Sequence, residues 1–314
     1  MYSFFKIGAK IAMRIYCSKT VVNFNTNTSY NYPKIIGANH SNSFFDAIVI
    51  AVNYPKPIYF LARGDAFNSP LIAKVLTALH LIPIYRLTEG KNNLGKNEDT
   101  FKRCIELLKQ NQTILIFSEG LCVNEWRLRP LKKGTARLAL LAHQEGVPNL
   151  RIQPTNLNYS SFTSNPKEVL VNFNSEFGPT KDSTAKVSEF YSQFNLQLKQ
   201  GLENNLVIQL EKKEIHLFEN RATITKKVLL ALPALLGYLL NRSIYIIFKN
   251  IAHKKTKNTV FYDSVLFGLL LLFYPLIVLI IAAVTGIIFN LYVAMLVFIS
   301  FPISAWTYSQ YKAI

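Results

Sequence analysis

Short apolar runs alternate with helix-like stretches through the first two thirds of the chain. The runs that predict strands are Lys34–Ala38, Leu81–Tyr85, Thr113–Phe117, Arg151–Thr155 and Val169–Phe173. Between and after them the apolar period changes to that of helices at Glu98–Lys109, at Ala136–Ala142 and in a polar segment that extends to Leu210. This order predicts an α/β fold with a mostly parallel sheet flanked by helices.

Residues 2–16 have the pattern of an amphipathic helix. Phe4, Ile7, Ile11 and Ile15 form one stripe, and Lys6, Lys10 and Arg14 lie on another. A basic amphipathic helix of this kind lies in a membrane interface. The alternative is a surface helix whose apolar stripe packs on its own domain.

The last fifty residues predict transmembrane helices. No charged residue lies between Asp263 and Lys312, which is enough chain to cross a bilayer twice at about 20 residues per span. Ser264–Thr285 and Ile287–Tyr308 therefore read as a hairpin of spanning helices with a break near Gly286–Asn290. The preceding apolar segment, Val228–Phe248, contains a proline and an arginine; we expect interfacial helices there, with a third span as the alternative.

The net charge is +17, and its placement favours a lipid surface over nucleic acid. From Lys226 to Lys257 there are seven Lys and Arg residues and no Asp or Glu. Basic residues that flank apolar helices bind anionic headgroups and mark the cytoplasmic side. We therefore expect membrane lipids as partners, no nucleic acid, and an inner (cytoplasmic) membrane location with the catalytic domain on the cytoplasmic side. The predicted segments are an N-terminal interfacial helix (1–22), a catalytic domain (23–225), basic interfacial helices (226–258) and a transmembrane hairpin (259–314).

Polar residues follow three of the predicted strands. His40, Arg86 and Glu119 each come just after a strand end. Because ligands bind beyond the carboxyl ends of strands in open α/β sheets, these side chains can converge on one pocket. His40 and Asp46 are suited to act as a base and its orienting carboxylate.

The motifs around these residues resemble the bacterial lysophosphatidic acid and glycerol-phosphate acyltransferase family. Asn39-His40 through Asp46 resembles the family's His-spacer-Asp motif, with five spacer residues here where four are commonest. Phe117-Ser118-Glu119-Gly120 resembles the Phe-Pro-Glu-Gly block, and Pro83-Ile84-Tyr85-Arg86 the block that ends in a phosphate-binding Arg. The segment 125–134, which ends in Lys133-Gly134, resembles the basic extension of the family, and Ile152-Gln153-Pro154 matches its fourth block weakly.

The resemblance implies a reaction and a set of site residues. A fatty acyl chain would move from an acyl thioester, acyl-CoA or acyl-carrier protein, to a hydroxyl of a glycerolipid or lysolipid. No bound cofactor or metal is expected. His40 and Asp46 would be catalytic. The substrate-binding residues would be Arg86, Ser118, Glu119, Gly120, Arg127 and Lys133.

Other readings of the sequence stay open. Residues 90–97 nearly match a nucleotide-binding P-loop but end in Asn97 where Ser or Thr is required. Ser41 or Ser43 could be a lipase-like nucleophile, although the chain has no Gly-x-Ser-x-Gly elbow. A lyso-aminolipid acceptor also fits the motifs, as does a catalytically silent lipid-binding membrane protein.

Overall fold

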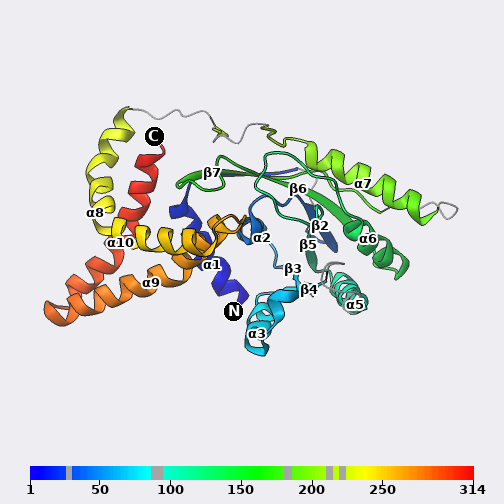
Figure 1. Cartoon of the computed structure of the whole chain (residues 1–314), viewed down its shortest axis with the longest axis horizontal. Helices are drawn as coiled ribbons and strands as arrows, with labels where there is room; N and C mark the ends of the chain where they lie inside the picture. Colours follow the sequence, from blue (N-terminus) through cyan, green and yellow to red (C-terminus); the bar gives the residue numbers. More distant parts are fainter. Residues whose placement is uncertain (26–29, 86–94, 180–185, 210–214, 219–223) are drawn as a thin grey trace.

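A seven-stranded sheet forms the centre of the computed structural model, which describes residues 1–25, 30–85, 95–179, 186–209, 215–218 and 224–314 (Figure 1). The spatial order is β1-β7-β6-β2-β5-β3-β4, and only the β6–β7 pair is antiparallel among these neighbours. The strands are β1 (Cys17–Phe24), β2 (Lys34–Ala38), β3 (Ile58–Arg63), β4 (Leu81–Ile84), β5 (Thr113–Phe117), β6 (Arg151–Tyr159) and β7 (Lys167–Phe173). The predicted α/β fold with a mostly parallel sheet is confirmed.

Helices cover both faces of this sheet and continue beyond it. They are α1 (Tyr2–Tyr16), α2 (Ser43–Asn53), α3 (Pro70–Ala78), α5 (Lys96–Lys109), α6 (Gly134–Gln144), α7 (Val187–Glu203), α8 (Ile224–Lys255), α9 (Tyr262–Ile288) and α10 (Leu291–Lys312), with a short 3-10 helix η1 (Gly64–Phe67). The central strand β2 is buried along its whole length. Its residues Ile35 and Ile36 belong to separate core clusters, because successive side chains point to opposite faces of a strand.

The two cores are built by different helices. One contains Leu108, Leu138 and Leu198, from α5, α6 and α7. The other contains Phe45 of α2 together with Phe267 of α9. The start of the apolar hairpin is therefore part of the same hydrophobic core as α2.

The first strand was not predicted. The helix predicted over residues 2–16 is confirmed as α1, but the rest of the predicted segment 1–22 is not helical: from Cys17 the chain continues as β1, parallel to β7. β1 is an edge strand with polar residues such as Lys19 and Asn23, so it lacks the continuous apolar run of a buried strand. Strand β3 was missed as well.

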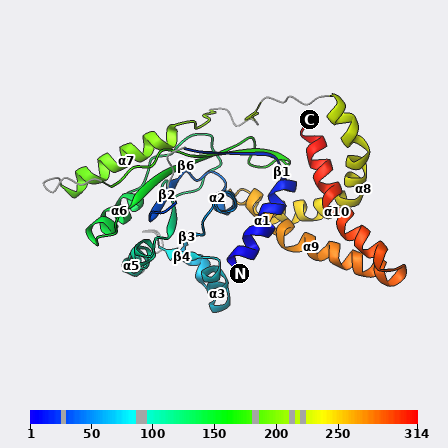
Figure 2. The same cartoon turned by 180° about the vertical axis from the view of Figure 1, so that it is seen from behind.

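The apolar stripe predicted on α1 faces away from the sheet. Phe4, Ile7 and Ile11 are 85%, 61% and 56% exposed, whereas Ala9 and Met13 are buried. Figure 2 shows α1 beside the base of the α9–α10 pair. The helix thus packs on the domain through another face, which includes Tyr2, Ala9 and Met13, and leaves Phe4, Ile7 and Ile11 exposed. This arrangement favours a membrane interface over packing of the apolar stripe on its own domain.

Within the described residues, three helices are long and apolar enough to cross a membrane: α8, α9 and α10. α9 and α10 form a hairpin that projects from the domain (Figure 1), and the break falls at Phe289 and Asn290, at the end of the predicted interval. α8 is one continuous helix of 32 residues with Pro233 inside it, where several interfacial helices were expected.

Candidate active site

The His40 and Asp46 side chains meet at the carboxyl end of β2. His40 Nδ1 lies 2.8 Å from Asp46 Oδ2. The Asp46 side chain is fully buried and that of His40 is 16% exposed. The His40 ring stacks on Phe117 at the end of the neighbouring parallel strand β5, with 4.0 Å between the ring centroids. The imidazole is therefore held from two sides, by a carboxylate at one nitrogen and by an aromatic face.

Asp46 is held by two further hydrogen bonds. The Asn42 backbone N–H donates to Oδ2 at 2.8 Å, and the Tyr159 hydroxyl donates to Oδ1 at 2.7 Å. Burial raises the pKa of Tyr159 well above its usual value, and the Asp46 charge raises this pKa further. Tyr159 is thus a hydrogen-bond donor whose proton stays on the phenol at ordinary pH. Hydrogen bonds to a carboxylate of this kind fix its orientation toward the histidine.

The five-residue spacer between His40 and Asp46 contains one unusual backbone conformation. Ser43 has φ of 52°, a left-handed conformation that costs L-residues of its type about 1 kcal/mol or more. It is the first residue of α2, and Asp46 lies in the first turn of that helix. This turn of the chain brings Asp46 back to His40 although six positions separate the two.

The end of β5 supports the histidine backbone. Glu119 Oε1 accepts from the His40 backbone N–H at 2.8 Å, and Oε2 accepts from the Arg129 N–H at 3.3 Å. Burial raises the pKa of Glu119 above its usual value, although these two N–H groups and His40 oppose part of this shift. Gly120 has φ of +66°, and an added Cβ would lie 2.9 Å from Lys132 Cγ. Glycine at this position therefore permits the tight turn that carries Glu119.

The other predicted substrate-binding residues differ in their placement. The Ser118 hydroxyl is buried and bonds Thr135 Oγ1 at 2.9 Å. The Arg127 side chain is 58% exposed and pairs with Glu125 at 2.7 Å, an interaction that raises the pKa of Arg127. Lys133 is exposed immediately before α6. Arg86 lies outside the described residues, as does most of the P-loop-like segment 90–97.

Sequence reasoning missed two residues that the structure places in this site. Tyr159 lies beyond the predicted end of its strand, and Cys122 follows the Glu119 turn with its Sγ accepting from the Ser43 N–H at 3.0 Å. One ligand atom each from His40, Asp46 and Cys122 lies within 4.8 Å of the others, a grouping that can hold a metal ion. A cation bound there would compete with the His40–Asp46 hydrogen bond. That the reaction needs no metal stays a prediction.

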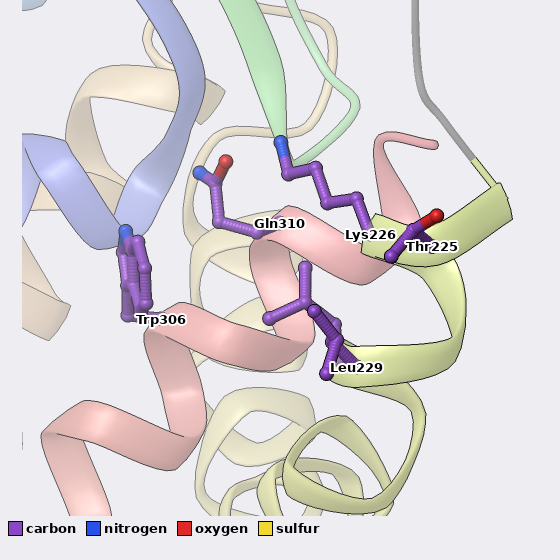
Figure 3. Close-up of a pocket in the computed structure, with 6 residues that line it drawn as sticks. Thr225, Lys226, Leu229, Trp306 and Gln310 are labelled. Carbon is purple, nitrogen blue, oxygen red and sulfur yellow. The ribbon is translucent and has the colours of Figure 1, made fainter.

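Two open cavities lie against α10, and neither is lined by His40 or Asp46. One, of about 360 Å³, lies between α8 and α10 (Figure 3). The other, of about 400 Å³, lies beside α1 and shares Trp306 and Gln310 with the first. Their cationic lining residues are Lys226, Lys10 and Arg14. Tryptophan together with basic side chains is typical of the headgroup level of a membrane.

Known proteins resemble the part of the chain that contains this site. Residues 19–157 match the protein-family model described as Acyltransferase. The chain is 26% identical over 143 residues to the chloroplastic 1-acyl-sn-glycerol-3-phosphate acyltransferase BAT2 of Brassica napus, covering 46% of this chain and 39% of that protein. The 1-acyl-sn-glycerol-3-phosphate acyltransferase of Bacillus subtilis (strain 168) is 26% identical over 149 residues, covering 47% of this chain and 69% of that protein.

A solved structure gives a further comparison. The crystal structure of the 1-acyl-sn-glycerophosphate acyltransferase PlsC from Thermotoga maritima aligns with a TM-score of 0.48 and 18% sequence identity, over 65% of this chain and 78% of that one. The aligned region spans less than half the length of the Brassica napus relative. Together, the family match and the Bacillus relative confirm the acyltransferase family resemblance for the segment that contains His40, Asp46 and Glu119.

Proposed function

We propose that this protein transfers a fatty acyl chain from an acyl thioester to the hydroxyl of a lysophosphatidic acid or a related glycerolipid or lysolipid acceptor. The observation that carries the proposal is the 2.8 Å contact between His40 Nδ1 and the fully buried Asp46. It lies at the carboxyl end of β2, within the segment that matches the acyltransferase family model.

His40 is the general base in this mechanism. Asp46 accepts a hydrogen bond from Nδ1–H, which keeps that proton on Nδ1 and leaves the Nε2 lone pair to take the proton of the acceptor hydroxyl. The hydroxyl oxygen attacks the thioester carbonyl carbon, the carbon–sulfur bond breaks, and the imidazolium returns its proton to the leaving thiolate. Asp46 stabilises the imidazolium between these steps, and Tyr159 and Asn42 keep Asp46 in place.

The setting favours a lipid acceptor at a membrane surface. α1 presents an exposed apolar stripe, and α9 and α10 form an apolar hairpin next to the same domain. A catalytic domain held at the inner membrane on its cytoplasmic side would have access to both acyl-CoA and acyl-carrier protein as donors. Arg127 and Lys133 are exposed cations available to donor or acceptor phosphates.

The test is direct acyl transfer by the full chain in detergent. Radiolabelled acyl-CoA and acyl-carrier protein are each combined with lysophosphatidic acid, glycerol 3-phosphate, lysophospholipids and a lyso-aminolipid. We expect one donor and acceptor pair to give a labelled diacyl or acylated product. Failure of every pair would favour the catalytically silent lipid-binding protein, and a trapped acyl-serine enzyme would favour the lipase-like alternative.

His40→Ala provides the mechanistic prediction. We expect turnover to fall by about three orders of magnitude or more, because general base catalysis and the oriented imidazole are lost together. The variant should still reach the membrane fraction. His143→Ala, which changes an exposed histidine at the end of α6, is the matched control. Near-normal turnover by His40→Ala would remove the proposed base.

A further inference from the structure

The first turn of α9 contacts the loop between His40 and Asp46. Ser264 Oγ donates to the Asn42 carbonyl oxygen at 2.9 Å and accepts from the Phe45 N–H at 3.0 Å. One residue earlier, Asp263 Oδ2 accepts from the Asn42 side-chain amide at 2.6 Å. Asp263 and Ser264 are 1% and 0% exposed. More than 200 residues separate the two sides of this contact along the chain.

The bond between Ser264 and Phe45 helps to cap the N-terminus of α2. The first N–H groups of a helix have no acceptor within the helix, and the residue before α2, Asn42, makes no side-chain capping bond to it. Acceptors from other segments take that role: Ser264 Oγ for Phe45 and Cys122 Sγ for Ser43. Phe45 immediately precedes Asp46, so the cap from α9 fixes the backbone next to the proposed catalytic carboxylate.

Asp263 seats α9 at this position. Its Oδ2 lies 2.7 Å from Lys167 Nζ, and both side chains are at most 1% exposed. The Tyr16 hydroxyl at the end of α1 donates to its Oδ1. A charge is buried at low cost only when it is paired and hydrogen-bonded. The partners of Asp263 come from α1, from the first residue of β7 and from the loop between His40 and Asp46. Together they fix the position of the first turn of α9 relative to that loop.

From these contacts we propose that Ser264, seated by Asp263, is a positioning residue for the His40–Asp46 pair. The apolar hairpin then contributes to the active site as well as to membrane attachment: its first turn holds the strained five-residue spacer in the conformation that closes the dyad. The effect on turnover rests on the proposed acyltransferase function, whereas the effect on the loop does not.

The test compares Ser264→Ala and Ser264→Cys in the full-length protein. We expect kcat to fall about tenfold or more for alanine and by less for cysteine, whose thiol is a weak donor and acceptor. KM for donor and acceptor should stay within about twofold, because neither substrate is bound by this serine. Alanine is a strong helix former, so a serine that served only to pack the helix would leave kcat unchanged.

Ser304→Ala is the matched control. Ser304 is a buried serine of α10 whose hydroxyl donates to the Phe301 carbonyl oxygen and accepts from the Asn241 amide. The Ser304→Ala variant loses comparable hydrogen bonds among the apolar helices and leaves the contacts of Asn42 and Phe45 unchanged. We expect its kcat to match that of the unmodified protein.

Hydrogen exchange of residues 41–47 provides a readout that needs no activity. Ser264→Ala should exchange faster there, because the Phe45 N–H loses its acceptor, and Ser304→Ala should not. Unchanged exchange, or faster exchange with an unchanged kcat, would overturn the positioning role. If the alanine variant does not reach the membrane fraction, the cysteine variant decides by the same criteria. If the unmodified protein transfers no acyl chain, the proposed function fails, and the exchange result still decides whether Ser264 holds the loop.

Discussion

At the scale of single residues, the main feature of the site is how completely Asp46 is held. Its two oxygens take hydrogen bonds from the His40 ring, the Asn42 backbone and the Tyr159 hydroxyl. His40 and Asn42 belong to the motif that the sequence displays, whereas Tyr159 lies more than a hundred positions away along the chain. The carboxylate therefore depends on the end of β6 as much as on its own loop, and its alignment can be changed without altering either member of the dyad.

Tyr159→Phe tests this dependence. A hydrogen bond to a charged group contributes about 1.5–3 kcal/mol, so we expect kcat to fall roughly tenfold to a hundredfold as Asp46 loses its Oδ1 donor. KM should change little. Tyr274→Phe removes another tyrosine hydroxyl that donates at 2.7 Å, to Asn241 Oδ1 among the apolar helices, and should leave kcat unaltered. Equal rates for the two variants would show that Tyr159 does not position the carboxylate.

The residues that support the dyad from other parts of the chain were not predicted from the sequence. Tyr159, Cys122 and Ser264 reach the loop from positions that no local spacing connects to His40. Helix-capping and strand patterns depend on neighbours within a few positions, so contacts between segments far apart along the chain leave no such pattern. His40 and Glu119 could be predicted because each follows the end of an apolar run, and Asp46 because its spacing from His40 resembles the His-spacer-Asp motif.

At the scale of elements, strands buried on both faces were predicted with the same bounds that the structure gives. Lys34–Ala38 and Thr113–Phe117 are the two examples. β6 continues past the predicted Thr155 because buried asparagines extend it: Asn156 donates to the Leu202 carbonyl oxygen and Asn158 accepts from the Val207 N–H. Tertiary partners compensate there for a polar sequence that does not read as a buried strand.

The prediction at the scale of elements concerns the packing of α8 against α10 at Gly237. This glycine lies where α8 crosses α10, and an added Cβ would be 2.0 Å from the Ser304 carbonyl oxygen. Gly237→Ala must separate the two helices, which we expect to destabilise the fold by about 1–3 kcal/mol. A melting midpoint in detergent measures this. Gly268→Ala in α9 is the control, since its Cβ would have its nearest neighbour at 3.7 Å, an ordinary contact; a midpoint lowered equally in both variants would contradict the close crossing.

At the scale of the whole molecule, one end of α8 lies beside the part of α10 that contacts the sheet, and the other end packs into the core of the domain. Near its beginning, Lys226 lines a cavity with Gln310, whose amide donates to the Ser18 carbonyl oxygen of β1. Near its end, Phe248 and Ala252 belong to the core cluster that contains Phe45. α8 is about 48 Å long at 1.5 Å per residue, longer than the roughly 30 Å bilayer core. A helix that crossed the bilayer would carry its far end away from the domain.

We therefore expect α8 to lie along the membrane surface although its length and composition permit a span. The variants Lys226→Cys and Lys255→Cys place single cysteines near the two ends of α8. Both should react with a membrane-impermeant maleimide added on the side of the membrane where the catalytic domain lies. Lys109→Cys, on α5 of that domain, identifies this side. A cysteine in place of Tyr292, which is 83% exposed at the tip of the hairpin, should react only from the opposite side. The unmodified chain gives the background from its three native cysteines. Labelling of Lys226→Cys and Lys255→Cys from opposite sides would make α8 a third span.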